Sequence, residues 1–117
     1  MKKIMSSSNG GKSSRVVTYK LYLGLNDKDT RLQKYDVLEA YKVANNIVLS
    51  QCDGATIWSG QGIYKHEDGA VVVEQTLVIE ISGASSRTIG VIVEMLKGAF
   101  NQESVLVDRV SSDRSFK

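Results

Sequence analysis

Between residues 15 and 110, hydrophobic side chains recur either at every second position or at every third to fourth position, and the two spacings alternate along the chain. The first spacing is typical of a strand with one buried face, and the second of an amphipathic helix. Their order is strand, helix, strand, strand, helix, strand. This order predicts an α+β fold of the ferredoxin-like βαββαβ type, with an antiparallel sheet and two helices on one face.

The first half of the pattern predicts a strand over residues 15–25 and a helix after it. The expected inward side chains of the strand are Val17, Tyr19, Leu21, Leu23 and Leu25. Asp29 or Thr30 is the expected N-cap of the helix, and Gly54 is the expected left-handed residue at its end. The apolar stripe of this helix is expected to comprise Val37, Tyr41, Ala44 and Val48, widened by Leu38, Leu49 and Cys52.

The second half predicts a hairpin, a helix and a short last strand. Two strand-like runs flank the turn "HEDG", and the glycines of "SGQG" favour a bulge in the first of these strands. The second run is expected to bury Val73, Leu77, Ile79 and Ile81. Ser85 or Ser86 is expected to cap the second helix, and the last strand is expected within residues 104–110. The stripe of the second helix is expected to be Ile89, Ile92, Val93, Leu96, Ala99 and Phe100.

The bulk composition limits the class of protein. With 117 residues and 42% hydrophobic side chains, the chain is expected to form one domain over residues 15–110, with a flexible tail at 1–14 and a polar tail at 111–117. No run is long and apolar enough for a membrane span or a secretory signal, so a cytoplasmic location is expected. The net charge of +2 is spread evenly, so nucleic acid is not an expected partner.

The stretch "GLNDKDT" crowds polar residues between a strand and a helix. We interpret Asp27 and Asp29 as complementing the dipole of the helix that follows. The alternative is a divalent cation held by Asn26, Asp27 and Asp29, but the spacing matches no calcium loop. We therefore expect neither a metal nor a cofactor in this protein.

Catalytic side chains are scarce in the sequence. His66, the single histidine, falls in the hairpin turn without a second member of an acid–base pair, and Cys52 falls on the apolar stripe of a helix. One cysteine also cannot form an internal disulfide. These features predict a protein that is not an enzyme.

The sheet face opposite the helices is the most informative surface. It is expected to present Lys20, Tyr22, Trp58, Tyr64, Glu74, Thr76, Val78 and Glu80. Exposed aromatic side chains favour packing of two copies sheet to sheet, and they also suit a planar ligand of the nucleotide type. In the second case Lys20, Lys65 or Arg87 would lie near the phosphates of a small anionic ligand.

Three stretches, "GLNDKDT", "GIYKHEDG" and the E-x-T-L of "VVVEQTLVIEI", resemble a group of short, uncharacterised bacterial and phage-borne proteins. The resemblance covers roughly residues 18–82. A phage-borne setting implies a role against host defence, by sequestering a nucleotide signal or by blocking a defence protein. The polar and aromatic residues that the shared pattern singles out are Asn26, Asp27, Lys28, Asp29, Gln33, Tyr64, His66 and Glu74.

These observations predict a non-catalytic, homo-oligomeric binding module that sequesters or senses a small, nucleotide-like ligand. The expected ligand-binding residues are Lys20, Tyr22, Asn26, Lys28, Trp58, Tyr64, His66, Glu74 and Arg87. One alternative is an enzyme of the dimeric α/β-barrel kind, in which His66 or Glu74 moves a proton on a small organic substrate. Another is an inhibitor that blocks a protein partner by surface contact alone.

Overall fold

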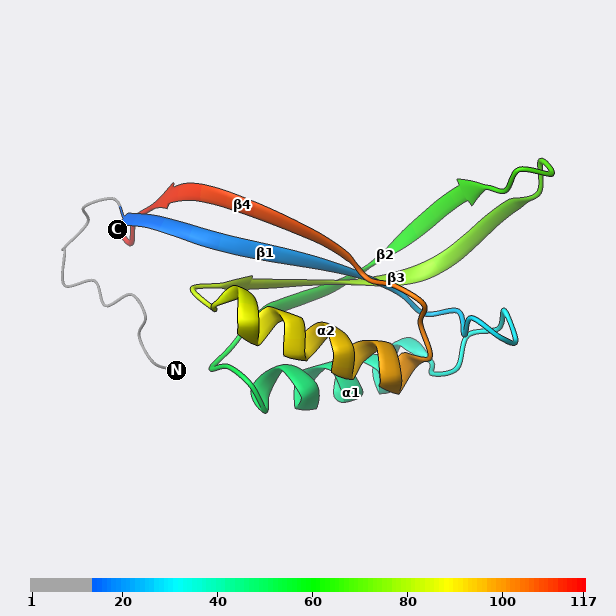
Figure 1. The fold of residues 1–117 in the computed structure, drawn as a ribbon, viewed down its shortest axis with the longest axis horizontal. Coiled ribbons are helices and arrows are strands. Elements are labelled where there is room, and N and C mark those ends of the chain that lie inside the picture. Colours follow the sequence, from blue (N-terminus) through cyan, green and yellow to red (C-terminus); the bar gives the residue numbers. More distant parts are fainter. Residues whose placement is uncertain (1–13) are drawn as a thin grey trace.

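The computed structural model describes residues 14–117, so the predicted tail at 1–14 lies almost wholly outside the described part of the chain. The elements are β1 (Ser14–Gly24), α1 (Val37–Leu49), β2 (Thr56–Lys65), β3 (Val71–Ser82), α2 (Ser86–Phe100) and β4 (Leu106–Arg114). One antiparallel sheet has the strand order β2-β3-β1-β4, and both helices lie on the same face of it (Figure 1). The predicted ferredoxin-like α+β fold is confirmed.

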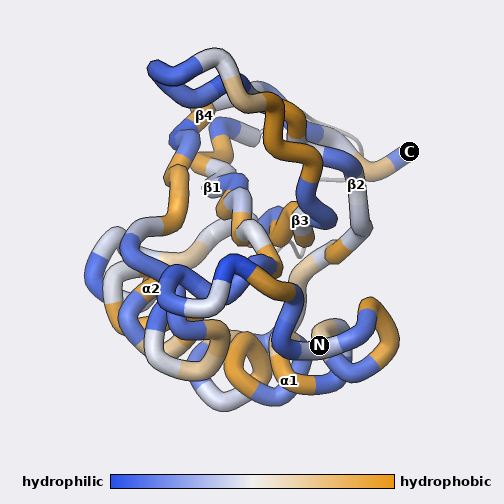
Figure 2. The backbone as a smooth tube through the Cα atoms, turned by 90° about the vertical axis from the view of Figure 1, so that its right-hand side faces the viewer, coloured by the Kyte–Doolittle hydropathy of each residue, from blue (hydrophilic) through white to orange (hydrophobic). Residues whose placement is uncertain are grey.

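The core lies between the helices and one face of the two central strands. Tyr19, Leu21 and Leu23 of β1 point into it, as the alternating pattern predicts, together with Leu77 and Ile79 of β3. The helices contribute residues of their predicted stripes at these buried positions: Ala44, Val48, Ile89, Ile92, Leu96 and Phe100. Ala40 and Ile47 of α1, which the sequence did not single out, are buried as well. Hydrophobic segments accordingly gather between the helix layer and the sheet when the molecule is viewed along its length (Figure 2).

Helix α1 begins later and ends earlier than the sequence predicts. Its N-cap is Asp36, whose carboxylate accepts a hydrogen bond from the Glu39 N–H at 2.9 Å, so the prediction of Asp29 or Thr30 as the cap is wrong. The helix ends at Ser50 rather than at Gly54. Residues 25–36 instead form a separate loop, which we call the anchor loop. Leu38 and Leu49, which were expected to widen the apolar stripe, face solvent instead, so this part of the prediction is wrong.

The hairpin of β2 and β3 has an unbroken register from the Thr56–Glu80 pair to the Lys65–Val71 pair, so the predicted bulge at "SGQG" is absent. Gly69, with φ of +88°, closes the turn, where the His66 N–H donates to the Ala70 carbonyl. The outer half of the hairpin, residues 61–75, extends away from the helices (Figure 1), and we call it the arm.

The second half of the chain follows the prediction closely at α2 and departs from it at β4. Ser85 caps α2, since its hydroxyl accepts from the Thr88 N–H at 3.1 Å. β4 continues to Arg114, so part of the segment expected to be a polar tail is a strand that pairs with the start of β1. In the described residues neither helix has the length and apolar character needed to cross a membrane.

Candidate functional site

The sheet face opposite the helices, here called the open face, carries a row of large side chains across its middle. Val78 of β3 pairs directly with Tyr22 of β1 and with Trp58 of β2. Val78 is buried, whereas the Trp58 side chain is 40% exposed. The unbroken register keeps Trp58 and Tyr64 on the same face, as expected from their positions. An aromatic surface is thus available on a face that no helix covers.

Beside this row the open face lacks side chains at three positions, Gly24, Gly60 and Gly62, which we call the glycine patch. Gly24 and Gly60 flank Thr76 in the register, and Gly62 pairs with Glu74. Successive residues on one face of a strand are about 7 Å apart. The glycine patch therefore separates Trp58 from Tyr64 along β2, with Thr76 and Glu74 alongside on β3.

Glu74 is held in one place within the glycine patch. Its Oε2 accepts a hydrogen bond from the backbone N–H of Asn26 at 3.0 Å. A Cβ atom placed on Gly24 would lie 2.8 Å from the Glu74 carboxyl carbon, so the carboxylate occupies the space that any other residue at position 24 would fill. A fixed carboxylate between aromatic side chains can contact a cation or accept a proton.

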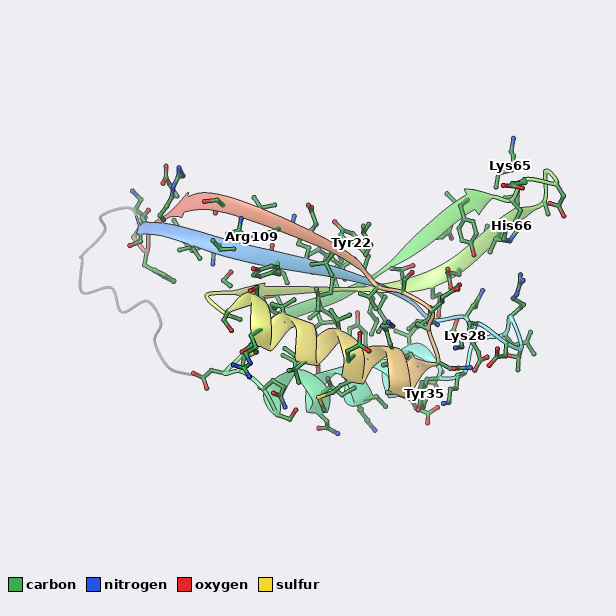
Figure 3. The ribbon with its side chains drawn as sticks, viewed as in Figure 1. Tyr22, Lys28, Tyr35, Lys65, His66 and Arg109 are labelled. Carbon is green, nitrogen blue, oxygen red and sulfur yellow. The ribbon has the colours of Figure 1, made fainter. Side chains whose placement is uncertain are left out.

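The arm carries Tyr64, Lys65 and His66 beyond the glycine patch. The rings of Tyr64 and His66 are 5.3 Å apart and nearly perpendicular, at 81°. Figure 3 shows Lys65 and His66 near the tip of the arm, away from both helices. His66 thus lies in the turn, as the sequence indicates, where its ring makes an edge-to-face contact with Tyr64.

The anchor loop is tied to the end of α2 rather than to the start of α1. The Asn101 side-chain amide donates to both Asp27 carboxylate oxygens at 3.0 Å and to Asp29 at 2.9 Å. Asp27 also accepts from the N–H groups of Asp29 and Thr30. These bonds, above all the one from Asn101, lower the pKa of Asp27 below its ordinary value of 3.8.

The interpretation of Asp27 and Asp29 as complementing the dipole of the following helix is wrong. Helix α1 begins only at Val37, and both carboxylates accept from Asn101 at the end of α2 instead. Within residues 14–117 no group of three metal-binding side chains is close enough to hold an ion. The amide of Asn101 takes the place that the cation hypothesis gave to a metal. Lys28 extends from this loop beside the end of α2 (Figure 3), and its N–H donates to the Asn101 carbonyl at 3.0 Å.

The other predicted ligand-binding residues are spread over the molecule. Glu74, Asn26, Tyr64 and Trp58 surround or adjoin the glycine patch. Lys20 pairs with Glu80, six residues from Glu74 on β3 and thus about 20 Å away, which is beyond the reach of one nucleoside. Arg87 lies in the first turn of α2, on the helix layer and at the end of that helix opposite Asn101.

Sequence reasoning missed three contributors, Gly24, Asn101 and Gln102. The Gln102 amide donates to the Asn26 carbonyl at 2.6 Å. Gly24 had a signal, because a glycine inside an alternating strand often marks the close approach of another group. Asn101 and Gln102 had none, since their partners are more than seventy residues away in sequence.

Comparison with solved structures identifies the fold with that of a phage enzyme. A phage SAM lyase in complex with S-methyl-5'-thioadenosine matches with a TM-score of 0.65 and 22% identity, over 98% of this chain and 96% of that one. The same kind of enzyme in its apo state matches with a TM-score of 0.61 and 22% identity, over 100% of this chain and 94% of that one. No curated protein matches the sequence.

This comparison overturns the prediction that the protein is not an enzyme, because both matching structures are of a lyase. The prediction rested on the scarcity of histidine and nucleophilic side chains in the sequence. The predicted resemblance to a group of uncharacterised proteins is confirmed at the level of the family. A family model described as "Protein of unknown function (DUF3574)" matches residues 18–116, and the chain belongs to that family.

Proposed function

We propose that this protein is a lyase that cleaves S-adenosylmethionine, or a closely similar sulfonium nucleoside, to S-methyl-5'-thioadenosine. The single observation that carries the proposal is the fixed carboxylate of Glu74 among the glycine patch and the exposed aromatic side chains. The fold of a phage SAM lyase over nearly the whole chain supports it. The proposal extends the earlier enzyme alternative, in which Glu74 moves a proton.

The chemistry of a sulfonium substrate suits this site. A sulfonium sulfur is a positively charged leaving group, so its carbon–sulfur bond breaks without a protein nucleophile. The electron pair of the bond leaves with sulfur, which becomes a neutral thioether in S-methyl-5'-thioadenosine. In this elimination Glu74 accepts a proton from the carbon next to the one that leaves sulfur, and the electrons of that carbon–hydrogen bond form a carbon–carbon double bond in the amino-acid fragment. Before the reaction the same carboxylate attracts the cationic end of the substrate.

The aromatic side chains provide the binding surface for the nucleoside in this proposal. Adenine is planar, and when it stacks on a tyrosine or tryptophan ring, that ring shields one face of the base from water. Trp58 and Tyr64 lie on either side of Gly60 and Gly62 along β2, and a Cβ atom placed on Gly60 would have open space around it. A ligand lying over the glycine patch would contact one of these rings and Glu74 together.

The direct test is to incubate the purified protein with S-adenosylmethionine and to detect S-methyl-5'-thioadenosine by liquid chromatography and mass spectrometry. We expect product with the wild type and at least a hundredfold less with Glu74→Gln, in the range seen when an acid–base group is removed. Glu103→Gln, at an exposed position between α2 and β4, is the matched control and should retain full activity. Absence of product from the wild type would contradict the proposal.

We further propose that the open face is covered by a second copy of the chain, so that the ligand lies where copies meet. On this face the side chains of Trp58 and Tyr64 are 40% and 47% exposed, and an isolated two-stranded ribbon such as the arm is marginally stable in water. Exposed apolar surface of this kind is typical of an interface. Native mass spectrometry should show an oligomer, and Trp58→Glu should shift it towards monomer; a monomeric wild type would contradict this assembly.

For the biological role we propose action against a host defence, in which the protein consumes a nucleoside that the defence requires. The support is the resemblance to phage-borne proteins and the phage source of the matching enzyme. Expression of the wild type should restore the growth of a phage restricted by such a defence, whereas Glu74→Gln should not. Equal rescue by both variants would favour blocking by surface contact.

A further inference from the structure

Asn26 is hydrogen-bonded through both of its backbone polar groups, and the two partners come from different parts of the chain. Its N–H donates to Glu74 on β3, and its carbonyl accepts from the Gln102 amide at 2.6 Å. Asn26 also forms an isolated bridge with Gln33 within the anchor loop. This one residue therefore connects the end of α2 to the carboxylate in the glycine patch.

Gln102 is itself held firmly. Its backbone N–H donates to the Lys97 carbonyl at 3.0 Å, after Asn101 has turned the chain with a φ of +49°. Its side-chain amide donates a second hydrogen bond to the Phe100 carbonyl at 3.2 Å, and Phe100 is 1% exposed in the core. The Gln102 amide, which donates to Asn26, is thus also attached to the buried Phe100 in the core.

We propose that Gln102 is a positioning residue, which fixes the Glu74 carboxylate over Gly24 by way of the Asn26 backbone. The inference rests on the proposed function, in which that carboxylate contacts the substrate. A carboxylate on a flexible side chain is useful in a reaction only when neighbouring groups hold it in one orientation. Gln102 does not touch the glycine patch, so its effect is exerted through Asn26.

Contacts that do not involve Gln102 also hold the anchor loop against α2, so the role of Gln102 differs from general support of this loop. The loop remains attached to α2 through Asn101, which bonds Asp27 and Asp29, and through the Lys28 N–H. Tyr35 adds an edge-to-face contact with Phe100 at 5.1 Å. Removal of the Gln102 donor leaves all of these contacts in place, so the expected consequence is local to Asn26 and Glu74.

The experiment compares Gln102→Met, which keeps the length of the side chain but has no donor, with Gln102→Lys, which keeps a donor of similar reach. Gln51→Met is the matched control, because the exposed Gln51 amide contacts only Ser50 among the described residues. Two quantities are measured: hydrogen exchange at the Asn26 amide by NMR, and kcat and KM for S-adenosylmethionine.

We expect Gln102→Met to raise the exchange rate of the Asn26 amide by about tenfold and to lower kcat by about tenfold, which is the effect of one lost hydrogen bond. KM should stay within about twofold of the wild-type value. Gln102→Lys should restore both, and Gln51→Met should change neither. Unchanged exchange at Asn26, or faster exchange with an unchanged kcat, would overturn the positioning role. If the wild type does not convert S-adenosylmethionine, the proposed function fails by itself. Hydrogen exchange at the Asn26 amide then decides alone whether Gln102 holds this backbone.

Discussion

The inner and outer halves of the β2–β3 hairpin have the same alternating pattern but opposite surroundings. Leu77 and Ile79, over the helices, are 0% exposed, whereas Val71 and Val73 on the same side of the same strand are 59% and 52% exposed. The pattern determines which side chains share a face, and the length of the helices determines how much of that face is covered. The difference leaves this face of the arm uncovered and available to bind other molecules.

The largest expected effect comes from truncating the same strand face in each half. Leu77→Ala should lower the free energy of unfolding by about 2–5 kcal/mol, because it leaves a cavity between sheet and helices. Val73→Ala should change it by about 0.5 kcal/mol or less in the monomer, as for other surface positions. Urea denaturation measures both. A larger loss for Val73→Ala that grows with protein concentration would show the arm to be covered by another copy.

Gly24→Ala should act on Glu74 while leaving the fold intact. The new methyl group would lie 2.8 Å from the Glu74 carboxyl, which must move, whereas the extended backbone of β1 accepts alanine. We expect the production of S-methyl-5'-thioadenosine to fall by about tenfold or more, with a change in unfolding free energy within about 1 kcal/mol. Gly90→Ala, on α2 with open space around it, is the control and should retain activity. Full activity of Gly24→Ala would remove Glu74 from the site.

Asp27→Asn tests the attachment of the anchor loop. The pKa of Asp27 is lowered in the folded protein, chiefly by Asn101, so its ionised form stabilises the fold above the unfolded value of 3.8. That stability is lost as the pH falls through the lower, folded pKa. We therefore expect the variant to melt below the wild type at pH 7 and the two melting temperatures to converge as the pH falls below the lowered pKa of Asp27. A gap that does not depend on pH would contradict the role of the charge.

The smallest effect is expected at the far end of the sheet, where β1 and β4 also extend past the helices. Arg15 and Asp113 form an ion pair at 3.3 Å, with side chains 68% and 69% exposed. Arg15→Ala should change the unfolding free energy by about 0.5 kcal/mol or less, because solvent and salt screen such pairs. Thermal denaturation at low and high salt measures it, and a loss above about 1 kcal/mol would show this end of the sheet to be more rigid than its exposure indicates.

The sequence was sufficient to predict the order of elements, the inward faces of β1 and β3 and the cap at Ser85, because each follows from local spacing. It was insufficient for the anchor loop, since Asp29 and Thr30 resemble helix caps and only the distant Asn101 gives Asp27 its real partner. The bulge predicted at Gly60 and Gly62 is absent, because glycines can also stay in a regular ladder. Because these glycines have no side chains, they leave the open face uncovered at their positions instead.

The sequence predicted several residues of the candidate site but not how they are arranged. Glu74, Tyr64 and Trp58 were selected as residues of the open face, but the reason that Glu74 is special lies in Gly24 and Asn26, which the register brings to it. Lys20 and Arg87 were selected for their charge, and the structure places Lys20 beside Glu80 and Arg87 in the first turn of α2, both away from Glu74. The absence of a nucleophile–base pair was read as absence of catalysis, an inference that fails for a substrate with a built-in leaving group.

The most direct test of the account is a titration of the isotopically labelled protein with S-methyl-5'-thioadenosine, followed through the amide resonances and the Trp58 indole. The account predicts that the largest shifts occur at Gly24, Asn26, Gly60 and Gly62 and at the Trp58 ring, and that Glu74→Gln or Gly24→Ala weakens them. Shifts confined to the helix layer around Arg87, or none at millimolar ligand, would contradict a nucleoside site on the open face.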